Sequence, residues 1–362
     1  MAIFRTLLTN NAEEHKMQIE RLPFGSFYNQ KVNQITLSND NCMSVSILEL
    51  GGRITHLLVP NSEGKIADVV LGLDNLNAYT KDPHYFGALI GRVANRIEGA
   101  QYEVNSETVM VNGNAYNGKH CVHGGRFGYH HRVWEEVEVI QNDDEIAVTL
   151  RMFDADGEEG FKNNVEIFAT YTLTNTNILT LQYKATSDGP TPISTTAHSY
   201  FNLFGHDYGC IDEHELEIYS NQVLEQREDR LPSGTMLPVE KTEFDFQAIT
   251  SLKAMVNNRI EINHSYVFNY PKNTKRPLLK MAKLKGDGRV LRVSSNESTL
   301  HFYNGHNLDG VEGKSGSVYE KYAGLCLEPK GFVNAINEPT FPCTIIDKLD
   351  CYQHTIVYDF SQ

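Results

Sequence analysis

The chain has 362 residues, of which 40% are hydrophobic and 22% are charged, so it can form a sizeable packed core. Its 46 acidic and 32 basic residues give a formal net charge of −14, which repels the phosphates of nucleic acids and the anionic surfaces of membranes. We therefore expect neither nucleic acid nor membrane as a partner.

Two further features of the sequence predict a cytoplasmic location. Residues 1–14 turn polar too early to contain the apolar region of a signal peptide, and the sequence has no run of 18 apolar residues. The six cysteines include no CxxC pair, so reduced, buried thiols are expected at Cys42, Cys121, Cys210, Cys326, Cys343 and Cys351.

Most periodic segments are short and alternate apolar with polar residues, as half-buried strands do. The clearest predicted strands are residues 44–50, 166–173, 179–185 and 215–219. Turn residues recur between such segments, for example at 111–114, 156–157 and 233–234. Short helices are predicted only at residues 73–79 and 246–256, which are too few to cover an α/β sheet.

The predicted fold class is therefore all-β, a large antiparallel β-sandwich with few short helices. Residues 1–21 lack strand character and are expected to be a loosely held N-terminal extension. Residues 22–362 contain no low-complexity linker and no repeat of fixed period, so we expect them to form one domain. The sequence does not specify an oligomeric state.

Polar islands place titratable side chains among glycines and aromatic residues at residues 91–97, 122–125, 197–203 and 326–331. Arg92 and Arg96 fit solvent-exposed charges. His123, followed by two glycines, fits either a turn or a close approach to a ligand, and His198 fits either a hydrogen-bonded core histidine or a functional one. Glu328 lies between apolar residues, where a carboxylate is either paired or functional.

The sequence lacks the motifs of metal, nucleophilic-serine and nucleotide-binding sites. His120 and His123 are three residues apart and His130 is followed by His131, but no HExxH motif accompanies them, and we expect no metal. There is also no GxSxG elbow, no P-loop and no GxGxxG segment, which argues against nucleophilic-serine and nucleotide-binding enzymes.

Taken in order, these polar islands resemble the signature segments of the aldose 1-epimerase family. The resemblance extends to residues 68–72, 85–92, 156–160 and 302–310, and it covers the chain from roughly residue 22 to residue 358. It implies a large sandwich of antiparallel sheets with a sugar cleft on one face. It also implies an enzyme that interconverts the α and β anomers of aldohexoses such as glucose and galactose without a cofactor.

The resemblance also implies roles for single residues. By motif, Glu328 is the general base, His198 is the general acid, and Asn95, Arg96 and His123 bind the sugar. These residue types suit the reaction, because one group must take the proton of the anomeric hydroxyl while the other gives a proton to the ring oxygen. Trp134, Tyr200 and Phe201 are expected to be core or cleft-wall aromatics.

The sequence departs from the family's usual pattern at several positions. Asn263 replaces an aspartate, His301 a glutamine, Ala197 an asparagine, and Lys330 the glutamine of the usual Glu-Thr-Gln. Asn263 and His301 are therefore also expected to contact the sugar. Lys330 either faces solvent or takes part in a change of specificity.

These departures leave two alternatives to a hexose mutarotase. The first is an epimerase of the same fold for a phosphorylated or modified hexose, with Lys330 or Arg96 as the cation near the cleft. The second is a non-catalytic carbohydrate-binding protein. The presence of both His198 and Glu328 argues against the second alternative, because binding alone has no use for a matched acid and base.

Overall fold

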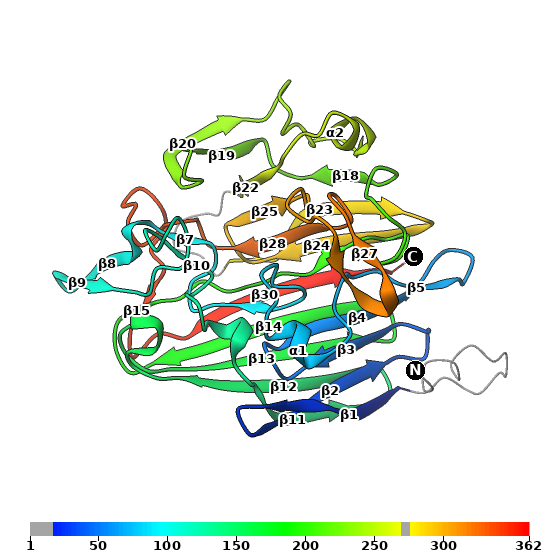
Figure 1. Ribbon diagram of the computed structural model, residues 1–362, viewed down its shortest axis with the longest axis horizontal. Helices are drawn as coiled ribbons and strands as arrows, with labels where there is room; N and C mark the ends of the chain where they lie inside the picture. Colours follow the sequence, from blue (N-terminus) through cyan, green and yellow to red (C-terminus); the bar gives the residue numbers. More distant parts are fainter. Residues whose placement is uncertain (1–16, 269–275, 362) are drawn as a thin grey trace.

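The computed structural model describes residues 17–268 and 276–361, which are built mainly from three antiparallel sheets (Figure 1). The five-stranded sheet has the order β1 (Gln18–Phe27), β2 (Gln30–Ser38), β3 (Ser44–Leu48), β4 (Arg53–Pro60) and β5 (Ile66–Asp68). The nine-stranded sheet has the order β11 (Glu135–Gln141), β12 (Glu145–Asp154), β13 (Val165–Thr174), β14 (Ile178–Ser187), β30 (Tyr352–Asp359), β24 (Arg289–Ser295), β23 (Leu279–Gly286), β18 (Glu215–Ile218) and β21 (Thr250–Ser251). The six-stranded sheet has the order β17 (Tyr200–Phe201), β28 (Leu325–Lys330), β25 (Thr299–Tyr303), β22 (Asn263–Val267), β19 (Gln222–Gln226) and β20 (Pro232–Pro238).

Short elements connect these sheets. Two-stranded pairs form between β6 (Leu89–Ile90) and β16 (Thr196–Ala197), β7 (Arg96–Ile97) and β10 (Cys121–Val122), β8 (Gln101–Val104) and β9 (Glu107–Met110), β15 (Thr191–Pro192) and β29 (Ile345–Ile346), and β26 (Val311–Glu312) and β27 (Val318–Tyr319). The helices of the described residues are α1 (Leu76–Tyr79) and α2 (Lys253–Asn257), with 3-10 turns at Glu98–Ala100, Tyr129–His131, Glu158–Gly160 and Lys314–Gly316. Neither α1 nor α2 has the length and apolar character that crossing a membrane requires.

The all-β prediction is confirmed, and the strands form for the reason that their alternation indicates. In β13 every second side chain, from Val165 to Leu173, is buried, and β14 pairs with it along nearly its whole length. The largest core cluster contains side chains from all three sheets, so each sheet gains its stability by covering another. In Figure 1, β25 and β28 lie over β24 and β30.

The alternating directions of side chains also determine which residues lie on the face of the six-stranded sheet that points away from the main core. Leu325 and Leu327 of β28 belong to the large core cluster, and so do Leu300 and Phe302 of β25. Because neighbouring residues of a strand point to opposite faces, Glu328 and the residues two positions before and after it lie on the face away from that core. The polar residues of β22, β25 and β28 therefore collect on one side of the sheet.

Several details differ from the prediction. The predicted helix at 246–256 is reduced to α2 at Lys253–Asn257, because Thr250–Ser251 pairs with β18 as strand β21. The predicted turn at 233–234 lies inside β20, where Gly234 has φ +91° and the pairing with β19 shifts register. Of the predicted extension, residues 1–16 lie outside the described residues, whereas residues 18–21 begin β1.

Arg92 is the clearest correction at the level of one side chain. We expected a solvent-exposed charge, but only 1% of the residue is exposed. Its Nε donates to Asp154 Oδ2 at 2.7 Å, and Nη1 donates to Thr191 Oγ1 and to the carbonyl of Lys162, both at 2.8 Å. The guanidinium thus ties the loop before β7 to the end of β12.

This buried ion pair gives a stability prediction. Replacing Arg92 by Met should lower the free energy of unfolding by about 3 to 5 kcal/mol, because Asp154 is left as a buried charge without its partner. Chemical denaturation would measure the change. The control is Arg151→Met, since Arg151 forms its ion pairs at the surface, where a pair contributes about 0 to 1 kcal/mol. Equal losses in the two variants would contradict the prediction.

Candidate active site

The predicted site residues meet at one cavity of about 330 Å³, which is within the usual size range of small-molecule sites. All of those residues line it, namely Asn95, Arg96, His123, His198, Asn263, His301 and Glu328. They come from segments far apart in the sequence, so the fold brings the polar islands together. The cavity is completed by Pro83, His84, Tyr85, Val122, Tyr200, Arg230, Tyr303 and Asn307.

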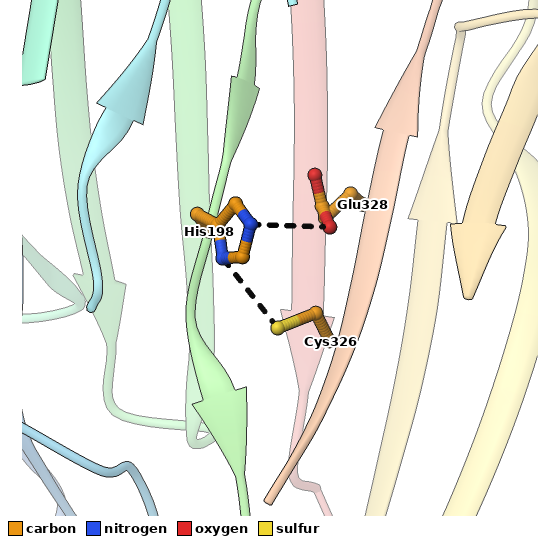
Figure 2. Close-up of side chains that lie close together, drawn as sticks. All are labelled: His198, Cys326 and Glu328. Carbon is orange, nitrogen blue, oxygen red and sulfur yellow. Dashed lines mark hydrogen bonds and ion pairs between the residues drawn. The ribbon is translucent and has the colours of Figure 1, made fainter. Parts of the chain in front are cut away.

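His198 and Glu328 face each other at this cavity (Figure 2). His198 lies between β16 and β17, and Glu328 lies in β28, which pairs with β17. His198 Nε2 is 3.8 Å from Glu328 Oε1, and the other ring nitrogen, Nδ1, is 3.6 Å from Cys326 Sγ. Both side chains are buried, and Glu328 Oε2 has no hydrogen-bond partner among the described residues. The hydrogen-bonding capacity of that oxygen is therefore unused within the described residues.

Burial changes the proton affinity of both groups. Burial raises the pKa of the Glu328 carboxyl above its ordinary value, and the Lys330 ammonium opposes that rise. Burial lowers the pKa of His198 to about 4. Tyr85 and Tyr200 lie beside the imidazole at ring-centroid distances of 5.8 and 5.1 Å. The aromatic rings thus take the place of water around the histidine.

Besides burial, the short distance between the two groups affects where a proton lies. At 3.8 Å, the carboxyl and the imidazole are close enough for one proton to lie on either group. The proton lies either on the carboxyl beside a neutral imidazole, or on an imidazolium beside a carboxylate. Only the second form offers a base and an acid at once.

A second group of side chains is placed by the pairing of β7 with β10. This pairing brings Asn95 next to His123, and both residues have left-handed φ angles, of 65° and 55°. The backbone N–H of His123 donates to Asn95 O at 3.0 Å, and the backbone N–H of Asn95 is 3.3 Å from His123 Nδ1. Since Nδ1 accepts that bond, the proton of the neutral ring lies on Nε2, which is a donor. Arg96 Nη1 donates to Asn95 Oδ1 at 3.0 Å.

A third group is a chain of hydrogen bonds across β28, β25 and β22. Lys330 Nζ donates to Ser265 Oγ at 3.3 Å, Ser265 Oγ lies 2.8 Å from His301 Nδ1, and His301 Nε2 lies 2.6 Å from Asn263 Oδ1. Because the amide oxygen of Asn263 only accepts, Nε2 of the neutral His301 ring carries the proton and donates to it. Nδ1 then accepts the hydrogen of the Ser265 hydroxyl. The NH₂ group of Asn263 is left as a donor for the cavity.

The prediction that Lys330 faces solvent is wrong. The residue is fully buried rather than solvent-facing. Its side chain lies beneath the cavity, where it bonds to Ser265 and acts electrostatically on Glu328.

The aromatic residues divide between wall and core. Tyr200 lines the cavity, whereas Trp134 and Phe201 belong to the large core cluster. Sequence reasoning did not single out Tyr85, Tyr303 or Arg230. Both tyrosines lie in the family-like segments, which could have indicated them, but the polar loop around Arg230 carries no such signal.

Within residues 17–268 and 276–361, one group of side chains places three potential metal donors close together. The donor atoms of His198, Cys326 and Glu328 all lie within 4.8 Å of one another. His120 and His123, whose spacing was noted in the sequence, do not belong to such a group among these residues. His120 Nδ1 accepts a hydrogen bond from the backbone N–H of Gly99 at 3.1 Å. The group of three donors contains both His198 and Glu328, the expected acid and base.

Comparison with known proteins agrees with the fold and with the order of these segments. The family model described as aldose 1-epimerase matches residues 33–359. The chain belongs to the aldose 1-epimerase family. It is 33% identical to galactose mutarotase from Mus musculus over 331 residues, which cover 91% of this chain and 94% of the relative. It is 31% identical to aldose 1-epimerase from Haemophilus influenzae, with coverage of 84% and 88%.

A solved structure of an aldose epimerase homologue from C. elegans has the same fold. It is 28% identical in sequence, has a TM-score of 0.81, and the match covers 91% of this chain and 99% of that one. The antiparallel sandwich expected from the family resemblance is therefore confirmed.

The buried histidines of the site give a prediction about stability and pH. Burial, together with the charges of Lys330 and Arg96, holds the pKa of His301 well below its ordinary value. A folded-state pKa below the unfolded one gives stability that is present above about pH 6.5 and is lost as the pH falls. The melting temperature should therefore fall between pH 7 and pH 5.

The variant His301→Gln carries the residue usual in the family. Its melting temperature should decrease less between pH 7 and pH 5. One proton taken up on unfolding changes the free energy of unfolding by about 1.4 kcal/mol per pH unit. The dependence of stability on pH should therefore be weaker in the variant. Thermal melts of both proteins from pH 5 to pH 8 would measure it. Identical slopes would show that His301 does not take up a proton on unfolding.

Proposed function

We propose that the protein is an aldose 1-epimerase that interconverts the α and β anomers of aldohexoses such as glucose and galactose. The observation that carries the proposal is the 3.8 Å approach of His198 Nε2 to Glu328 Oε1 at the wall of one cavity. Family membership and relatives named galactose mutarotase and aldose 1-epimerase support it.

In the proposed reaction, Glu328 is the base and His198 is the acid. Glu328 takes the proton of the anomeric hydroxyl while protonated His198 gives its proton to the ring oxygen. The C1–O5 bond breaks and the C1–O1 bond becomes a carbonyl, which leaves an open-chain aldehyde. Rotation about C1–C2 presents the other face of the carbonyl to O5. Reclosure returns one proton to His198 and one to O1, so the pair is regenerated.

The remaining residues are proposed to hold the sugar. Asn95, Arg96 and His123 form one side of the site, and Asn263 with His301 forms another. Arg96 is a cation near the position where negative charge develops on the sugar, so it would stabilise the transition state as well as binding. No step needs a metal or a redox cofactor.

We also propose a cytoplasmic location and a small-molecule aldohexose as the partner. The six cysteines are all free, which fits a reducing compartment. The expectation that all six are buried was wrong, since only Cys121 and Cys326 are buried. The acidic balance of the chain supports the expectation that it binds neither nucleic acid nor membrane surfaces.

The charges at the cavity favour a second candidate, an anionic sugar such as a hexose 6-phosphate. Arg96 and Arg230 both line the cavity, and Glu328 is the one carboxylate among the lining residues. Guanidinium groups bind phosphate oxygens in pairs of hydrogen bonds. The same acid and base would serve such a substrate, so the two candidates differ in binding and not in chemistry.

Replacing either member of the pair should nearly abolish mutarotation. Glu328→Gln and His198→Asn are each expected to lower kcat by at least about 100-fold, because general acid and base groups contribute about 10² to 10⁴ in rate. The double variant should be little worse than either single one, since the groups act in one cycle. Polarimetry of freshly dissolved α-glucose and α-galactose measures the rate.

The matched control is Glu320→Gln, which neutralises an exposed glutamate elsewhere and should keep the parent rate. A Glu328→Gln protein that equilibrates anomers as fast as this control would rule out the mechanism.

Asn263 tests the specificity of the site. Its NH₂ group offers donors where the family's usual aspartate offers acceptors, and an unmatched polar group in a closed site costs about 1 to 3 kcal/mol. Asn263→Asp should therefore lower KM for glucose and galactose by about tenfold, and raise KM for their 6-phosphates by adding a negative charge. Saturation kinetics on all four sugars would show it.

The control for that experiment is Asn307→Asp, which adds the same charge at another position of the cavity wall. An unchanged or higher KM for every sugar in Asn263→Asp would exclude this role for the residue. A parent protein with a much lower KM for the 6-phosphates than for the free sugars would favour the second candidate function.

A further inference from the structure

We propose that Lys330 is a positioning residue whose buried positive charge keeps Glu328 in the carboxylate form that can accept the proton of the sugar. The proposal rests on the base role given to Glu328 above. It assigns the site a component that the family's usual glutamine cannot supply, because glutamine carries no charge.

The placement of Lys330 follows from β28. Lys330 lies two residues after Glu328 on the same strand, so both side chains lie on the face away from the main core. The residue is fully buried. Among the described residues, Lys330 has no carboxylate within ion-pair distance, and its side-chain hydrogen bond is to the neutral Ser265 hydroxyl. Burial lowers the pKa of Lys330 while Glu328 and Glu297 raise it, so its ammonium form is supported by these acids and not by a contact partner.

The charged and titratable groups around Lys330 and Glu328 come from several elements. Those that interact with Lys330 are Glu328, Glu297, Arg96, His301 and His123. Those that interact with Glu328, besides Lys330, are His198, Cys326, Tyr200 and Tyr358. Glu297 is the second carboxylate near Lys330, and it forms an ion pair with Arg276 at 3.5 Å. Lys330 thus interacts with two buried acids, only one of which lines the cavity.

This arrangement affects whether Glu328 or His198 holds the proton. Burial favours the uncharged form of the pair, a carboxylic acid beside a neutral imidazole, which contains no base. A positive charge on the strand of Glu328 stabilises the carboxylate, and so favours the form of the pair in which the proton lies on His198. Lys330 therefore raises the fraction of the pair that is ready for catalysis.

The first test compares the parent with Lys330→Gln, which carries the family's usual residue. The ionisation of Glu328 would be followed by ¹³C NMR of protein labelled at the glutamate carboxyl carbon, with the signal assigned by its loss in Glu328→Gln. We expect the titration midpoint of Glu328 to rise by about one pH unit in Lys330→Gln. Lys321→Gln removes an exposed positive charge and serves as the matched control.

Kinetics should show the same change in another way. At pH 7, kcat of Lys330→Gln should fall about tenfold while KM changes less than about threefold, and the pH profile of kcat/KM should move to higher pH. Lys330→Arg, which keeps the charge, should retain the parent profile. Lower activity without any shift of the profile or of the Glu328 midpoint would indicate a merely structural role and overturn the proposal.

A second variant should shift the titration midpoint of Glu328 in the opposite direction. Glu297→Gln removes the competing negative charge next to Lys330 without changing a residue that lines the cavity. The midpoint of Glu328 should then move to lower pH, and a rise would contradict the proposal. The NMR titrations need no turnover, so they decide the role of Lys330 even if polarimetry showed no mutarotation and the proposed function failed.

Discussion

The two-residue period of β28 is the constraint on which the site depends. Leu325 and Leu327 hold the strand to the main core, and this leaves Cys326, Glu328 and Lys330 on the opposite face, under the cavity. A shift of register by one residue would send the carboxylate into the apolar core and the leucines into the cavity. The same hydrophobic contacts that stabilise the sandwich therefore fix the position of the proposed base.

Burial also determines the electrostatics of the site. A carboxyl and an imidazole exposed to water would titrate as separate groups, about two pH units apart. Here Tyr85 and Tyr200 lie beside the imidazole, and at 3.8 Å one proton can lie on either group. The group that holds this proton depends on nearby charge, which is why a lysine that does not line the cavity can influence the reaction.

Much of the fold could be predicted from the sequence because alternation is a local property. The strands at 166–173 and 179–185 were found within one or two residues of their ends, since every second residue is buried. The helix predicted at 246–256 was mostly wrong, because Thr250 and Ser251 form strand pairs with a segment that a local pattern does not include. The polar islands were also local, and their order in the chain identified the family.

What the sequence could not show was the pairing of charges over long distances. Arg92 was expected in solvent because its partner, Asp154, is 62 residues away. The burial of Lys330 was equally invisible, because it depends on Ser265 of another strand. Arg230 reaches the cavity from a loop with no recognisable motif. Each of these positions is set by the packing of sheets and not by neighbours in the sequence.

The exchange of backbone hydrogen bonds between Asn95 and His123 has a consequence for binding energy. Each loop fixes the other during folding, through one bond to a carbonyl and one to a ring nitrogen. A sugar that enters the cavity meets donors whose conformational entropy has already been lost, so little further ordering is needed on this side of the site. Less of the binding free energy is therefore lost to ordering the protein on this side of the site.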